Sequence, residues 1–115
     1  MANTFKVVTK AGVTSADVIY TVAGSTTTII LGLIVGNTTS GAITSTVTLG
    51  TDTANRAGAN NETNQDVELI TTAAIPGNSS LELLSGNKIV METTDTLSVT
   101  GSAAVDVALS ILEIT

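Results

Sequence analysis

The sequence contains no cysteine, no histidine and no tryptophan, and a single tyrosine and a single phenylalanine are its only aromatic residues. Without cysteine, neither a disulfide nor a thiolate metal site can stabilise the fold. Without histidine, the most common general base and transition-metal ligand is missing. Few aromatic rings also disfavour a typical sugar-binding cleft, because sugar faces commonly stack on such rings.

Catalysis would therefore have to use carboxylates alone. A glycoside hydrolase needs two of them across the scissile bond. The candidates are Glu62, Asp66 and Glu68, or Glu92 and Asp95. We favour solvated surface charges as the interpretation of both groups, and we expect a protein that is not an enzyme and has no cofactor.

Positive charge is scarce as well, with four basic residues against ten acidic ones and a net charge of -6. The basic residues are Lys6, Lys10, Arg56 and Lys88. Because binding to nucleic acid needs clustered basic side chains, this scatter argues against nucleic acid as a direct ligand. The strongest apolar run, residues 29–35, is far shorter than the roughly 20 residues of a membrane helix, so we expect no membrane partner either.

What the chain does contain is aliphatic residues and threonine, which fills roughly one position in five. Threonine, valine and isoleucine are β-branched and favour strands over helices. Eight segments with strand character are separated by turn residues: 17–22, 26–36, 42–49, 67–73, 80–84, 88–92, 96–100 and 104–114. The pattern predicts an all-β fold, a single antiparallel β-sandwich of seven to eight strands over residues 1–115, Ig-like or jelly-roll.

Within this pattern, residues 26–36 and 42–49 are separated by turn residues and are predicted to form a β-hairpin. In the second segment aliphatic residues and serine alternate with threonines, so Val47 is predicted to face the core. The alternation of the last segment shifts near Ile111, which predicts a bulge there or burial on both faces. The first residues are expected to form an extended arm.

One segment, residues 51–66, is polar, rich in asparagine and without alternation. Loops of this length are commonly functional. Its oxygen-bearing side chains match no EF-hand spacing, and a cation site stays an alternative here: Asp52, Asn55, Asn60, Asn61, Glu62 and Asp66.

The predicted strands carry few charges on their outward positions, whereas monomeric sheet proteins usually protect their edges with charged residues. We therefore expect a homo-oligomer, most simply a trimer. The loop and the N-terminal arm supply the predicted partner contacts: Phe5, Lys6, Asp52, Arg56, Asn60 and Asn61.

The two ends of the chain, above all the start "MANTFK" and the ending "LSILEIT", resemble a family of small virion structural proteins of tailed phages, of the marine phage and cyanophage type. Residues 1–49 and 75–115 carry the resemblance. It implies a β fold and a place in the virion, after synthesis in the host cytoplasm. A head decoration, or cement, protein in contact with the major capsid protein is the expected role. A neck, tail or fibre-associated protein and a host-surface or glycan-binding module are the alternatives.

Overall fold

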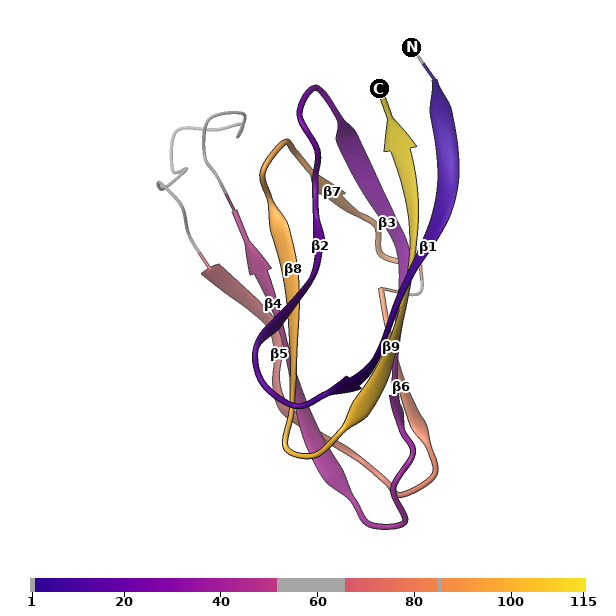
Figure 1. The fold of residues 1–115 in the computed structure, drawn as a ribbon, viewed down its shortest axis with the longest axis vertical. Coiled ribbons are helices and arrows are strands. Elements are labelled where there is room, and N and C mark those ends of the chain that lie inside the picture. Colours follow the sequence, from indigo (N-terminus) through magenta and orange to yellow (C-terminus); the bar gives the residue numbers. More distant parts are fainter. Residues whose placement is uncertain (1, 52–65, 85) are drawn as a thin grey trace.

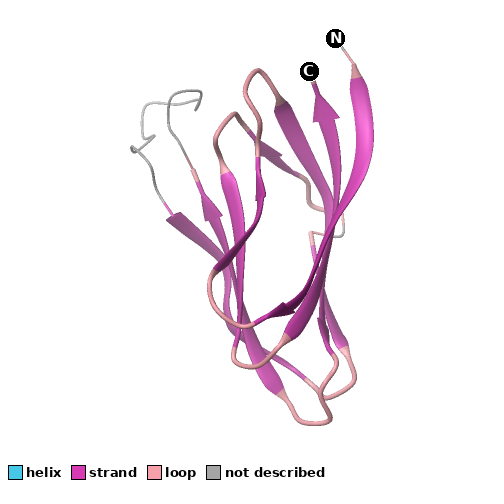
Figure 2. Ribbon diagram, in the orientation of Figure 1, coloured by secondary structure: helices cyan, strands magenta, loops and turns pink. Residues whose placement is uncertain are grey.

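The computed structural model describes residues 2–51, 66–84 and 86–115 (Figure 1). Within these ranges the chain forms nine β-strands and no helix (Figure 2). The strands are β1 (Asn3–Val13), β2 (Asp17–Thr21), β3 (Thr27–Asn37), β4 (Ile43–Gly50), β5 (Asp66–Ile75), β6 (Ser80–Leu83), β7 (Ile89–Met91), β8 (Thr96–Gly101) and β9 (Val105–Ile114). The all-β prediction is confirmed.

The strands form two antiparallel sheets that face each other. Sheet A has the order β1-β9-β3-β6, and β7 also pairs with β3, while sheet B has the order β2-β8-β4-β5. Every pairing is antiparallel. The predicted antiparallel β-sandwich is therefore confirmed.

The strand order also decides between the two predicted sandwich types. Because β6 and β7 both pair with the same edge of β3, they occupy one strand position between them. If β6 and β7 are counted together as the sixth strand, β8 becomes the seventh and β9 the eighth. Sheet A then has the strand order 1-8-3-6, and sheet B has the order 2-7-4-5. This is the order of an eight-stranded jelly roll.

The core lies between the sheets and consists of aliphatic side chains and Met91. It follows from simple alternation, since every second residue of β4 and β8, and of β9 as far as Ile111, is buried and the residues between them are not. Val47 is fully buried, as predicted, and its neighbours Thr46 and Thr48 are on the other side of β4.

The predicted hairpin of residues 26–36 and 42–49 is wrong. β3 pairs in sheet A with β9, β6 and β7, whereas β4 pairs in sheet B with β5 and β8, so the chain crosses from one sheet to the other at residues 38–42. The amide of buried Asn37 holds this crossover, because its Nδ2 donates to the carbonyl oxygens of Gly41 at 2.8 Å and Ile75 at 3.0 Å. Two strands that cover the same core from opposite sheets show the same alternation as a hairpin.

The expected N-terminal arm is instead the 11-residue strand β1, which pairs with β9 at one edge of sheet A. Its residues are exposed on both faces apart from Val8 and Val13, so no apolar alternation marks it as a strand in the sequence. The predicted bulge near Ile111 lies on the neighbouring strand. Ile30 pairs with Ile111 and Gly32 with Ser110, so that Leu31 of β3 is the extra residue.

A charge at the centre of β4 tests the burial of this strand. We expect Val47→Asp to lower the free energy of unfolding by about 4 kcal/mol or more, because an unpaired carboxylate would be buried among aliphatic side chains. Thr44→Asp, on the other face of the same strand, is the control and should stay within about 1 kcal/mol of the parent. Equal denaturant midpoints for the two variants would contradict the assigned core face.

Candidate interaction surface

The face of sheet A that points away from sheet B is apolar and open. Antiparallel partners share a face, so the pairing of Phe5 with Leu112 and of Ile34 with Ala108 places these side chains opposite the core-facing Leu109 and Ile111. Its most exposed apolar residues are Phe5 at 73%, Val7 at 63%, Val90 at 49% and Ile34 at 44%. Half-buried members of the same face are Ile29, Leu31, Ala108, Leu112 and Ile114.

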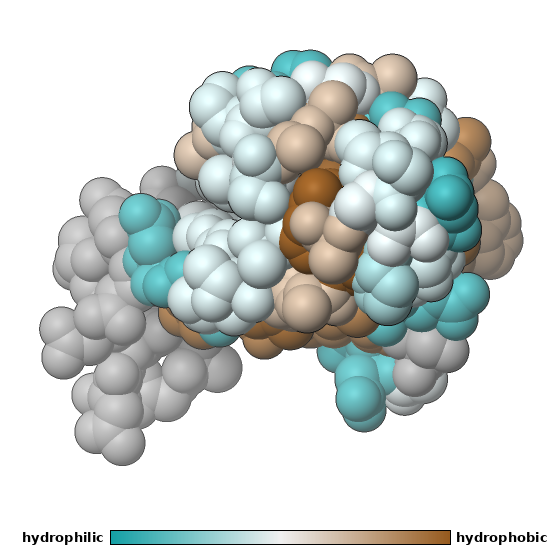
Figure 3. Space-filling model, turned by 90° about the horizontal axis from the view of Figure 1, so that it is seen from below, coloured by the Kyte–Doolittle hydropathy of each residue, from teal (hydrophilic) through white to brown (hydrophobic). Residues whose placement is uncertain are grey.

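We call this surface the outer face of sheet A. In the end view of Figure 3, apolar atoms reach the surface on the right, the side on which β1 and β9 lie in Figure 1. Among the paired residues of this face only Glu82 and Asp106 are charged, and both are acidic. Four adjacent strand positions therefore present aliphatic and aromatic groups to water.

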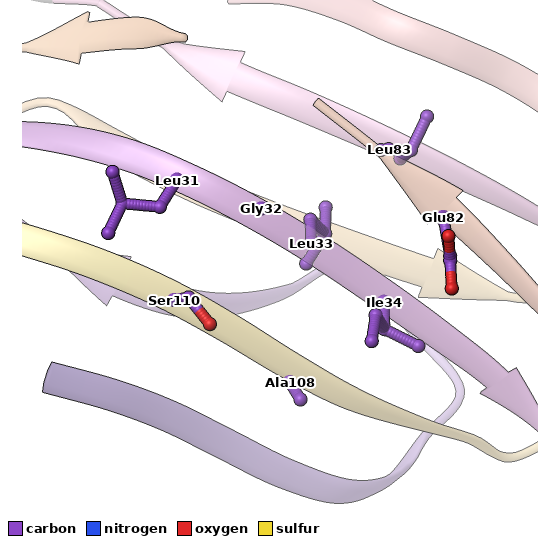
Figure 4. A pocket seen from close by; sticks show the side chains of 8 residues that line it. All are labelled: Leu31, Gly32, Leu33, Ile34, Glu82, Leu83, Ala108 and Ser110. Carbon is purple, nitrogen blue, oxygen red and sulfur yellow. The ribbon is translucent and has the colours of Figure 1, made fainter. Parts of the chain in front are cut away.

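A shallow hollow of about 230 Å³ lies in this face over β3, β6 and β9 (Figure 4). It exists because its floor is made by small residues, Gly32 on β3 and Ala108 and Ser110 on β9. Nothing lies within 4 Å of the position that a Cβ of Gly32 would occupy. Ile34 and Leu31 form apolar walls, and Glu82 lies at the side of β6.

The lysines of β1 do not protect this face. Lys6 pairs with Ile111 and Lys10 with Val107, so both lie on the inner side of the strand. The Nζ of Lys6 lies 2.7 Å from Glu113 Oε1, and that of Lys10 lies 3.6 Å from Asp17 Oδ2. The exposed outer side of β1 carries Asn3, Phe5, Val7 and Thr9, none of which is charged.

A cluster of polar side chains bridges the two sheets on the inner side of β1. The Tyr20 hydroxyl, from sheet B, donates a hydrogen bond of 2.5 Å to Glu113 Oε2, and Thr28 Oγ1 lies 2.7 Å from the same hydroxyl. Burial, reinforced by the bond to the Glu113 carboxylate, raises the pKa of Tyr20 to about 12. Hydrogen bonds from Lys6 and then Tyr20 hold the pKa of Glu113 below its usual value. The cluster thereby joins the two sheets and fixes the Lys6 side chain.

The predicted partner contacts are brought together only in part. Phe5 and Lys6 are neighbours on β1 but point to opposite faces, so only Phe5 belongs to the outer face of sheet A. The other four, Asp52, Arg56, Asn60 and Asn61, lie outside the described residues. Apart from Phe5, the residues of this face were not predicted from the sequence as partner contacts. Its one signal in the sequence was the run of residues 29–35, in which apolar side chains point to both sides of β3.

The carboxylates considered for other chemistry have simpler roles where they are described. Asp95 accepts a hydrogen bond of 2.9 Å from the backbone of Glu92 and so closes the turn before β8. Asp66 is exposed at the start of β5, and the predicted cation loop otherwise lies outside the described residues. In the described part of the chain no three acidic residues gather as a metal site would require, and no helix there could cross a membrane.

Comparison with known proteins adds little to this surface. No protein-family model matches the chain, and no curated protein matches it. A solved structure of Bacillus endospore appendages, described as disulfide-linked pili, aligns with 97% of this chain and 84% of its own at 15% identity, with a TM-score of 0.49. A chain of the T13 IBDV viral particle aligns with 98% of this chain and 39% of its own at 14% identity, with a TM-score of 0.26. Likenesses at these levels do not bear on function.

The hydrogen bond between Tyr20 and Glu113 predicts that the folded state loses stability both at high pH and at low pH. Because the pKa of folded Tyr20 is raised from 10 to about 12, its contribution to stability is complete below pH 10 and is lost as the pH rises toward 12. Because the pKa of Glu113 is lowered, its contribution is present above pH 4.5 and is lost at lower pH.

Tyr20 is the only tyrosine, so the ultraviolet absorbance of tyrosinate reports its titration directly. The folded protein should titrate near pH 12, and Glu113→Gln should move the midpoint toward 10. Thr71→Val, a change of an exposed threonine far from Tyr20 in the chain, is the control. A parent midpoint at 10 would show that Tyr20 is neither buried nor bonded to Glu113 in solution.

Proposed function

We propose that the protein is a non-enzymatic structural subunit of a tailed-phage particle, most specifically a head decoration protein that acts as a homotrimer. The observation that carries the proposal is the outer face of sheet A, on which Phe5 and Val7 are 73% and 63% exposed. Leaving such a surface in water costs roughly 25 cal/mol for each Å² of apolar area. A subunit that works inside an assembly covers it.

Two further observations support this role. The jelly-roll order is one that viral capsid subunits use, although lectin domains and cupins share it, so the fold alone does not decide the function. The ends of the chain, which resemble phage virion proteins, are the edge strand β1 and its neighbour β9 in the exposed face. The most telling parts of the resemblance thus lie in two of the strands that build the surface.

The physical role of such a subunit is to favour the assembled shell. A protein that binds the assembled particle and not its free parts stabilises the particle by mass action. In this proposal the major capsid protein is the second partner, and the particle is where the protein acts.

The number of copies of the protein in each particle distinguishes this function from its alternatives. Quantitative mass spectrometry of purified particles should find the protein in hundreds of copies, as a shell component requires. A dozen copies or fewer would instead assign it to the neck, tail or fibres. If purified particles contain none, while the isolated protein binds a glycan array, the virion proposal fails in favour of a glycan-binding module.

A further inference from the structure

The outer face of sheet A has two unlike ends. At the β1 edge the Phe5 ring projects from the sheet, and 73% of the residue is exposed. Toward the opposite edge, between β9 and β6, the sheet is hollowed beside Gly32. Since a projecting ring and a hollow lie on one surface, we propose that copies of this chain associate head to tail, the Phe5 side chain of one copy entering the Gly32 hollow of the next.

The sizes of the ring and the hollow agree. An apolar protein cavity of about 150 Å³ holds a benzene molecule. The hollow measures about 230 Å³ and is lined by the apolar Leu31, Ile34 and Ala108 together with the polar Glu82 and Ser110, so a phenyl ring fits against its apolar side. Phe5 is the only phenylalanine of the chain, and the outer position on β1 aims it away from its own core.

The plan area of the face, which the two contacts of each copy in a ring would share, is close to what one partner buries in a typical interface. Four strand positions at about 4.8 Å and ten residues at about 3.3 Å give a plan of roughly 19 by 33 Å, or about 600 Å². A typical stable interface covers about 800 Å² of accessible surface on each partner, and a surface with projecting side chains exceeds its plan area. Glu82 lines the hollow itself, and Asp106 lies at the other end of β1 from Phe5, where its Oδ1 accepts a hydrogen bond of 3.1 Å from Gly12 N. The apolar Phe5 therefore brings no like charge to Glu82.

The β6/β7 edge of sheet A disfavours extension of the sheet from one copy to the next. The β6/β7 edge is broken into strands of four and three residues, with positive φ angles at Leu84 and Gly86 between them, so it offers no continuous edge for pairing. Contact then depends on side chains of the outer face, and a head-to-tail contact between unlike patches closes when the rotation fits. The inference rests on the proposed self-association and identifies the outer face of sheet A as the contact surface. In the trimer, the three copies turn this face toward a common axis.

Two valines of similar exposure provide a matched pair of variants. Val7 lies on the outer face of sheet A and is 63% exposed, while Val18 lies on β2 in sheet B and is 52% exposed. In sedimentation experiments Val7→Asp should weaken trimer formation at least about tenfold, because it places a charge in an apolar contact, and Val18→Asp should leave it unchanged. Circular dichroism should show both variants folded, since both side chains are exposed. If the two variants associate equally, the outer face of sheet A is not the contact surface.

Cysteine pairs test the contact itself, because the chain has no cysteine of its own. Under mild oxidation a Phe5→Cys, Ile34→Cys double variant should form covalent trimers, whereas each single variant stays monomeric on a denaturing gel. Phe5→Cys with Val18→Cys is the control that should form none. Covalent dimers alone would show a two-fold, face-to-face arrangement, and dimers of single Phe5→Cys would show an edge-to-edge one; either overturns the ring.

The outcomes separate this inference from the proposed function. If the parent protein is a trimer but the double variant does not cross-link, the Phe5 contact is wrong and the virion role is unaffected. If the parent protein remains a monomer at high concentration, the inference fails together with the self-association on which it rests. The copies counted in purified particles decide the virion role independently of both.

Discussion

The pairing register of β9 is the constraint on which the rest of the structure depends. β9 lies between β1 and β3, and its alternation sends Leu109 and Ile111 into the core and Ala108 and Leu112 outward. A shift by one residue would exchange these two sets. The same register that buries the core therefore also places Phe5 and Ile34 on the outer face of sheet A.

With so few aromatic residues, the core is built from aliphatic side chains and Met91, and this explains where polar groups are tolerated. Asn37 is buried only because its amide holds three backbone carbonyls at the crossover. Tyr20 reaches across the open end of the sandwich because Glu113 and Thr28 are there to meet its hydroxyl. Both sites join the two sheets at their ends, where aliphatic packing does not.

The strands that bury one face were predictable from the sequence, as β4 and Val47 show, because alternation with period two is a local property. The partner of each strand was not, since β3 and β4 have the pattern of a hairpin and belong to different sheets. β1 escaped prediction because it is an edge strand with both faces exposed. Of the two predicted contacts that the structure describes, Phe5 lies on the candidate surface and Lys6 does not. Whether a side chain points inward or outward depends on a pairing that one sequence does not display.

The central claim is that the outer face of sheet A is covered by a second copy. Hydrogen exchange of the unmodified protein, followed as a function of concentration, tests this most directly. The account predicts that amides of β1 and of residues 31–34 become more protected as the concentration rises, while those of β2 do not change. Protection of β1 and residues 31–34 that is independent of concentration, or a gain confined to sheet B, would contradict it.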